Sequence, residues 1–161
     1  MFFWFLGVSW AFVWLVFRSP ALDYRFVLAG SVLPLGDALV GGPRLLHTLA
    51  FAVALLAGVM LATRHRRLVR RRWIGLAIGV FMHLVLDGIW SEAAVFWWPF
   101  FGVAFPPGPL PELDRGGVNW LLEAAGVAAL AWCWTAFGLT DPERRRRFVH
   151  TGQLDREVLP S

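Results

Sequence analysis

The stretch GVFMHLVLDGIW, residues 79–90, reads as the apolar middle of a helix, yet it carries His83 and Asp87. The two residues are four apart, so they share one face of a helix. Ionisable groups are costly inside a hydrocarbon layer and are rare there without a function. The stretch therefore predicts both a helix and a site that other parts of the chain complete.

The whole chain is as apolar as this stretch. Of its 161 residues, 58% are hydrophobic and 16% are charged, and the mean hydropathy is +0.59. Soluble domains are nearer ~45–50% apolar and ~25% charged. The composition thus predicts an all-α fold, a polytopic membrane helical bundle formed by residues 1–140. Cys133 is the only cysteine, which excludes an internal disulfide and a thiolate metal cluster.

Five apolar runs have about the length of a membrane span. The predicted spans are residues 2–17, 26–40, 45–63, 73–90 and 118–139. Pro34 interrupts the second run. The first run lacks the basic start of a signal peptide, so we expect a retained helix there.

Arginine-rich links set the expected orientation. The links 64–72 (RHRRLVRRR) and 144–147 (RRRR) would stay on the cytoplasmic side of an inner or plasma membrane. The N-terminus would then lie outside, and residues 141–161 would form a cytoplasmic arginine-rich tail. The aromatic link 91–117 would lie at the outer interface. Membrane lipids are the expected partners; arginine runs also suit nucleic acid, which we do not expect here.

In that orientation, four ionisable side chains from three helices reach a similar depth. Asp37 lies near the end of the second run, and His47 near the start of the third. His83 and Asp87 lie in the outer half of the fourth. Two imidazoles and two carboxylates are a usual ligand set for zinc and also suit iron or manganese. We therefore expect a divalent metal ion, with zinc as the first candidate.

Two further carboxylates are candidates for catalysis. Glu123 lies in the outer part of the fifth run and Glu92 just after the fourth, and either could serve as a general base, a further ligand or a partner of a ligand. His65 and His150 lie in arginine-rich stretches and are expected at the surface. Two other functions stay open: a small transporter or ion-conducting subunit with a proton relay, and a non-catalytic assembly protein whose polar residues join helices.

Three motifs follow one another along about residues 25–102. They are GSVLPLGD (30–37), RLLHTLAF (44–51) and GVFMHLVLDGIWSEAAVFWWPFFG (79–102). This order resembles the YdjM-like, membrane-bound metal-dependent hydrolases, also described as LexA-binding, inner-membrane-associated hydrolases. That family shows an LPD-type acidic segment, a His-Ser/Thr pair opening a helix, a His-x-x-x-Asp helix and a Trp-Pro-Phe element.

The sequence matches three of the four features of this pattern and departs from the first. His47-Thr48, the His83 and Asp87 pair, and Trp98-Pro99-Phe100 match its last three features. Leu35 stands where the family has an acid, and Asp37 follows two residues later. This departure leaves the number of carboxylate ligands open.

The resemblance implies a metal-dependent hydrolase and names no substrate. Together with the ligand set, it predicts an integral membrane hydrolase of an ester or phosphoester, with the metal held by Asp37, His47, His83 and Asp87. The aromatic run 96–105 (FWWPFFGVAF) favours a lipid-like or envelope substrate, although an ordinary interfacial aromatic belt explains it equally well.

Overall fold

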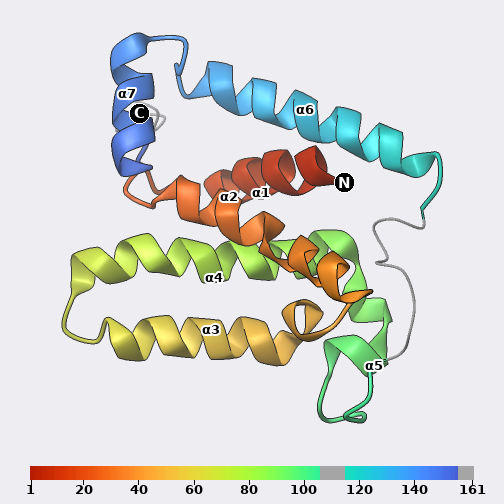
Figure 1. Ribbon diagram of the computed structural model, residues 1–161. Coiled ribbons are helices and arrows are strands. Elements are labelled where there is room, and N and C mark those ends of the chain that lie inside the picture. Colours follow the sequence, from red (N-terminus) through yellow and green to blue (C-terminus); the bar gives the residue numbers. More distant parts are fainter. Residues whose placement is uncertain (106–114, 156–161) are drawn as a thin grey trace.

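The computed structural model describes residues 1–105 and 115–155, and in this part of the chain every regular element is a helix. Figure 1 shows their arrangement. The α-helices are α1 (Phe2–Phe17), α2 (Tyr24–Val32), α3 (Leu49–Ala62), α4 (Arg67–Asp87), α5 (Ala93–Phe96), α6 (Val118–Ala136) and α7 (Pro142–Thr151). Three short 3-10 helices are η1 (Leu33–Val40), η2 (Leu45–His47) and η3 (Ile89–Ser91).

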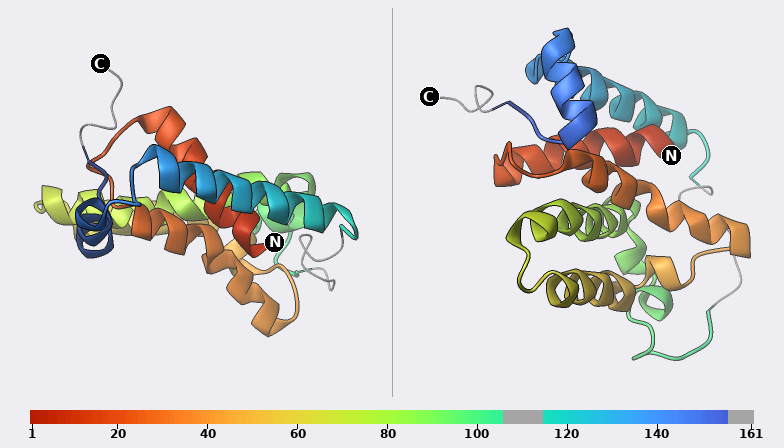
Figure 2. Two further views of the ribbon diagram at one scale, coloured as in Figure 1. Left: turned by 90° about the horizontal axis from the view of Figure 1, so that it is seen from above. Right: turned by 60° about the vertical axis from the view of Figure 1, so that its left-hand side comes forward.

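The longer helices pack side by side in the order α6, α1, α2, α4, α3. Figure 2 shows the same succession from two further directions. α3 and α4 run antiparallel, joined by a tight turn, and α7 lies across one end of the molecule (Figure 1). α5, η1 and η2 gather at the opposite end, where α4 also finishes. The carboxyl end of α4 thus meets the two short helices that precede α3.

Glycines allow two of these helix pairs to approach closely. A Cβ on Gly30 of α2 would overlap the backbone of α4, and a Cβ on Gly79 of α4 would overlap the backbone of α2. Gly7 of α1 and Gly126 of α6 meet in the same way. The contact between α2 and α4 matters most for function, because the next turn of each helix carries part of the candidate site.

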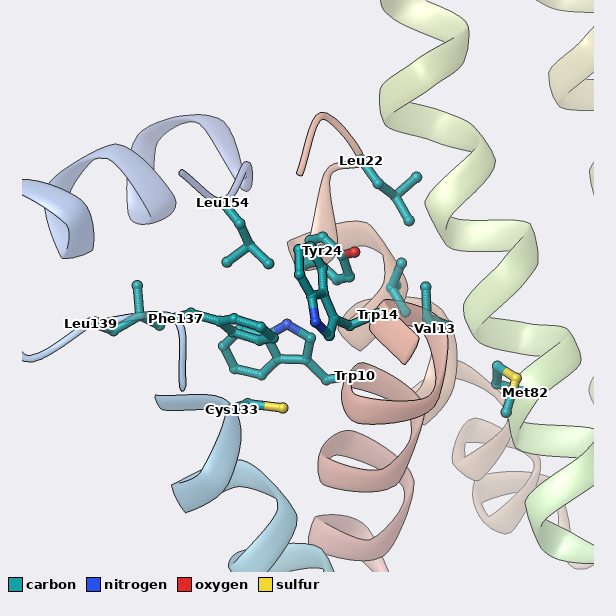
Figure 3. Packing of buried hydrophobic residues seen from close by; sticks show 11 residues of the cluster. Trp10, Val13, Trp14, Leu22, Tyr24, Met82, Cys133, Phe137, Leu139 and Leu154 are labelled. Carbon is teal, nitrogen blue, oxygen red and sulfur yellow. The ribbon is translucent and has the colours of Figure 1, made fainter. Parts of the chain in front are cut away.

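The main hydrophobic core joins α1, α2 and α6 to the C-terminal part of the chain. Trp10 and Trp14 of α1 lie at its centre, against Tyr24 and Phe137 (Figure 3). The Trp10 ring also stacks on Phe148 of α7, with the ring centroids 5.1 Å apart. The buried members are Trp10, Val13, Trp14, Leu22, Tyr24, Val27, Met82, Cys133, Phe137, Leu139 and Leu154. Part of the predicted arginine-rich tail is therefore packed against α1.

The buried carboxylate of Asp23 links α2, α4 and α7 at the end of the molecule where α7 lies. Asp23 is fully buried, accepts a hydrogen bond from the Arg25 backbone N–H and so begins α2. Its oxygens also accept from the Arg25 guanidinium at 3.0 and 2.8 Å and from Arg72 Nε of α4 at 3.4 Å. Arg25 in turn donates to the Val149 carbonyl of α7 at 2.6 Å. Buried charges persist only when paired in this way.

None of the described helices combines the length and the apolar character that crossing a membrane requires. α1 and α3 have 16 and 14 residues, which at about 1.5 Å per residue is shorter than a hydrocarbon core of ~30 Å. The run 26–40 divides near Pro34 into α2 and η1. α4 has 21 residues, but its first turns belong to the arginine-rich link. The prediction of a five-span membrane bundle is therefore wrong.

The predictions built on those spans are wrong with them. They are the multi-pass localisation in an inner or plasma membrane, and the orientation with the N-terminus outside and the C-terminus cytoplasmic. The arginine runs that defined this orientation lie at the α3–α4 turn and on α7, where most of their side chains are exposed. Of the link 91–117, residues 106–114 lie outside the described part of the chain, as do residues 156–161 of the predicted tail.

Candidate metal centre

The last turn of α4 carries the first two site residues. His83 and Asp87 lie one turn apart on the same face, and both are fully buried. Gly88 ends the helix directly after Asp87 with φ of 71°, a conformation that strongly favours glycine. The spacing read from the sequence therefore does place the two side chains together.

The ring of His83 is held from two sides. Its Nδ1 lies 2.7 Å from the carbonyl oxygen of Ser31 in α2, and Phe5 of α1 stacks on it with ring centroids 3.9 Å apart. Because a carbonyl oxygen only accepts, this contact assigns the proton to Nδ1. The Nε2 atom is then a lone-pair donor, and it is buried with no hydrogen-bond partner among the described residues.

His83 is also neutral at ordinary pH. Burial lowers the pKa of its imidazole to about 3, against the opposing effect of the hydrogen bond to Ser31. A neutral imidazole is the form that binds a metal ion.

His47 lies next to His83, although it belongs to a different element, η2. It ends η2, directly before Thr48, whose Oγ1 accepts a hydrogen bond from the Phe51 N–H at 3.0 Å and begins α3. Its Nδ1 lies 2.9 Å from Asp37 Oδ2. The Nε2 atom is therefore the one that would coordinate an ion.

Asp37 links the two short helices. Its Oδ2 also accepts from the backbone N–H groups of Arg44 and Leu46, at 2.8 and 3.1 Å. One carboxylate oxygen thereby folds the chain between η1 and η2 into a loop and holds the His47 ring. Asp37 was predicted as a metal ligand; among the described residues it is not part of the group that could hold an ion, and its carboxylate contacts Nδ1 of His47 instead.

Three of the four predicted ligands converge. Donor atoms of His47, His83 and Asp87 all lie within 4.8 Å of one another, and all three residues are buried. The two imidazole rings stand nearly perpendicular, with centroids 5.2 Å apart. Zinc lies about 2.0–2.2 Å from its ligands, so donors up to ~4 Å apart can share one ion. These three residues could hold a metal ion after small side-chain rotations.

Arg115 also contacts Asp87. Its NH2 group lies 3.3 Å from Asp87 Oδ1 and also donates to the backbone carbonyl of Asp87. Its side chain is 29% exposed, whereas the Asp87 side chain is fully buried. Sequence reasoning missed this residue, although Arg115 is the only basic residue in the link 91–117. It also missed the Ser31 carbonyl, because a backbone acceptor leaves no signal in a sequence.

The two candidate catalytic carboxylates lie outside the converging group. Glu123 of α6 accepts the backbone N–H groups of Phe2, Phe3 and Trp4 at 2.5, 2.7 and 3.3 Å, and so caps α1. Burial opposes ionisation of Glu123, but the hydrogen bonds from these amides outweigh it and lower the pKa of the carboxyl. Glu92 is exposed at the start of α5.

The remaining two histidines are exposed. His65 lies in the turn between α3 and α4, and His150 lies in α7. Their predicted surface position is confirmed.

No protein-family model matches the chain, and no curated protein or solved structure matches it either. The resemblance to the YdjM-like hydrolases therefore stays a prediction that rests on the quoted motifs.

Proposed function

We propose that the protein is a metal-dependent hydrolase that acts on an ester or a phosphoester. The observation that supports this most strongly is the convergence of His47, His83 and Asp87 on one buried point. Two imidazole donors and one carboxylate are a set that catalytic zinc sites use, with a further position left for water or substrate. The order of the family-like motifs supports the same function.

Each part of the site has a distinct role in this proposal. His47, His83 and Asp87 would hold the ion, with zinc as the first candidate and iron or manganese as others. A divalent ion supplies a Lewis acid and makes water acidic enough to act as a nucleophile near neutral pH. Asp37 and the Ser31 carbonyl each hold one Nδ1, and this orients the Nε2 donors.

An apolar groove supports the lipid-like substrate that the aromatic run favoured. It has a volume of about 360 Å³ and lies between the start of α3 and the segment around α5. Leu49, which lines it, follows His47 by two residues. The other lining residues are Ala50, Val53, Ala54, Phe96, Trp97, Trp98 and Phe100. Burial of an alkyl or aromatic part of a substrate in this groove would be favourable, because it removes apolar surface from water. We therefore propose an ester that carries such a group.

Hydrolysis of model esters tests the function. Protein stripped with a chelator and protein reloaded with zinc would be assayed on p-nitrophenyl acetate and p-nitrophenyl phosphate. We expect hydrolysis of at least one ester to depend on zinc and to fall to background in His83→Ala. The matched control is His65→Ala, because His65 is exposed and far along the chain from the site residues. Hydrolysis that is independent of zinc, or equal in the wild type and His83→Ala, would contradict the proposal.

A non-catalytic structural role is the second candidate, and two contacts favour it. Asp37 pairs with His47, and Asp87 pairs with Arg115. Such pairs also join helices in proteins that bind no metal. This role predicts wild-type protein without bound metal, and alanine variants at these positions that unfold more easily and show no other defect.

A further inference from the structure

Arg115 occupies a position that none of the proposed ligands shares. His47, His83 and Asp87 are fully buried and Asp37 is 4% exposed, whereas the Arg115 side chain is 29% exposed. Arg115 nevertheless touches Asp87 directly. Among the described residues of the site, Arg115 therefore has the polar side chain that is most exposed to solvent.

The contact with Asp87 does not use all the N–H groups of the Arg115 guanidinium. A guanidinium carries five N–H groups. In Arg115 the NH2 group serves Asp87, and NH1 lies 4.0 Å from the thioether of Met1, which is a weak acceptor. Within residues 1–105 and 115–155, Nε has no hydrogen-bond acceptor. Nε or NH1 can thus donate a single hydrogen bond to an oxyanion while NH2 keeps its contact with Asp87.

The charge of the site selects the kind of oxyanion. The two carboxylates of Asp37 and Asp87 balance a divalent ion, and the imidazoles would be neutral as ligands, so Arg115 leaves the loaded site with a net positive charge. A neutral carboxylic ester gains little from that charge. A phosphoryl group gains both from the charge and from a charged hydrogen bond that the guanidinium donates to one of its oxygens.

We infer that Arg115 is the residue that binds the phosphoryl group of a phosphoester substrate beside the metal centre. This inference rests on the proposed hydrolase function and narrows it to phosphoesters. Arg115 would hold the anion next to Asp87, and the ligands would hold the ion that polarises it.

Inorganic phosphate is the probe for a test by calorimetry on the full chain. Zinc content is measured first for the wild type and for Arg115→Ala, Arg115→Lys and Arg145→Ala. The last variant is the control, since it removes the same charge from an exposed position on α7. We expect phosphate to bind the zinc-loaded wild type and Arg145→Ala equally. Binding to Arg115→Ala should be about tenfold weaker or more, as expected for loss of charged hydrogen bonds.

The outcomes separate this inference from the proposed function. Wild-type protein that holds no zinc would overturn the proposed function. Zinc-loaded protein that binds no phosphate, or binds it equally with and without zinc, would overturn the inference alone. So would equal phosphate affinity in Arg115→Ala and the wild type. If Arg115→Ala loses zinc, Arg115→Lys decides: weaker phosphate binding at full zinc content supports the inference, and unchanged binding overturns it.

Discussion

Asp37→Asn should weaken zinc binding without abolishing it. Asp37 Oδ2 accepts three hydrogen bonds, from His47 Nδ1 at 2.9 Å and from the N–H groups of Arg44 and Leu46 at 2.8 and 3.1 Å. Asparagine keeps an acceptor oxygen but loses the charge. A hydrogen bond to a charged group contributes about 1.5–3 kcal/mol and a neutral one about 1 kcal/mol. The His47 contact should therefore weaken by roughly 0.5–2 kcal/mol.

That loss converts into a measurable change in affinity. About 1.4 kcal/mol corresponds to a factor of ten, and loss of a carboxylate behind a ligating histidine typically costs about 10–100-fold in metal affinity. We expect the zinc dissociation constant of Asp37→Asn to rise by about that factor in a competition titration against a chelating dye. Asp141→Asn is the control, because the Asp141 side chain also accepts a backbone N–H, that of Glu143, but lies at the exposed start of α7.

Two results would refute this reasoning. Unchanged zinc affinity in Asp37→Asn would mean that Asp37 does not support His47 as a ligand. A loss as complete as that in His83→Ala would mean that Asp37 is itself a ligand, as the sequence alone suggested. Either conclusion requires that the circular dichroism spectrum of Asp37→Asn match that of the wild type.

Further variants test the fold around the site. Gly79→Ala should lower the free energy of unfolding by about 1–3 kcal/mol, because the new Cβ would overlap the α2 backbone; Gly58→Ala, with open space around it, should raise it by up to about 1 kcal/mol. Denaturant titration of both variants measures these free energies of unfolding. Equal changes in Gly79→Ala and Gly58→Ala would refute the close approach of α2 and α4. Glu123→Gln should cost about 1 kcal/mol, because the amide keeps an acceptor oxygen for the Phe2 or the Phe3 N–H group but loses the charge. Because the folded-state pKa of Glu123 is lowered, its contribution is present above the unfolded pKa of about 4.3 and is lost as the pH falls through the folded value. Unfolding measured from pH 7 to pH 3 should therefore show a steeper loss in the wild type than in Glu123→Gln, and parallel curves would contradict this.

Local signals in the sequence located several helices well. The run 2–17 coincides with α1, and the run 118–139 contains α6. Pro34 marked the break between α2 and η1 correctly. These predictions succeeded because helix ends depend on nearby residues. The same kind of signal was present for α7, because Asp141 caps this helix and Pro142 is its first residue. The arginine run within α7 was nevertheless interpreted as a tail.

The membrane prediction failed because an apolar run is not the same as an apolar helix. α4 begins at Arg67, within the arginine-rich link, and the second run is divided into a short α-helix and a 3-10 helix. Composition cannot report where backbone hydrogen bonding starts and stops. The length of each helix and its apolar character together decided the question, and only the structure supplies the bounds of the helices.

The clustering of His47, His83 and Asp87 was predicted from the sequence, but part of the reasoning behind that prediction is wrong. His83 and Asp87 share a face because of their spacing, which is local. His47 was added because a membrane orientation placed it at the same depth, and that orientation is wrong. His47 joins the site because Asp37 folds η1 onto η2, and His83 is held by Ser31 because Gly30 and Gly79 let α2 and α4 touch. Such long-range contacts could not be read from one sequence.

The metal content of the purified protein tests the central claim most directly. After incubation with zinc and removal of the excess, elemental mass spectrometry should find about one zinc per chain in the wild type and in His65→Ala, and almost none in His83→Ala. Wild-type protein that retains no stoichiometric metal, or His83→Ala that retains as much as the wild type, would contradict the account of His47, His83 and Asp87 as a metal centre.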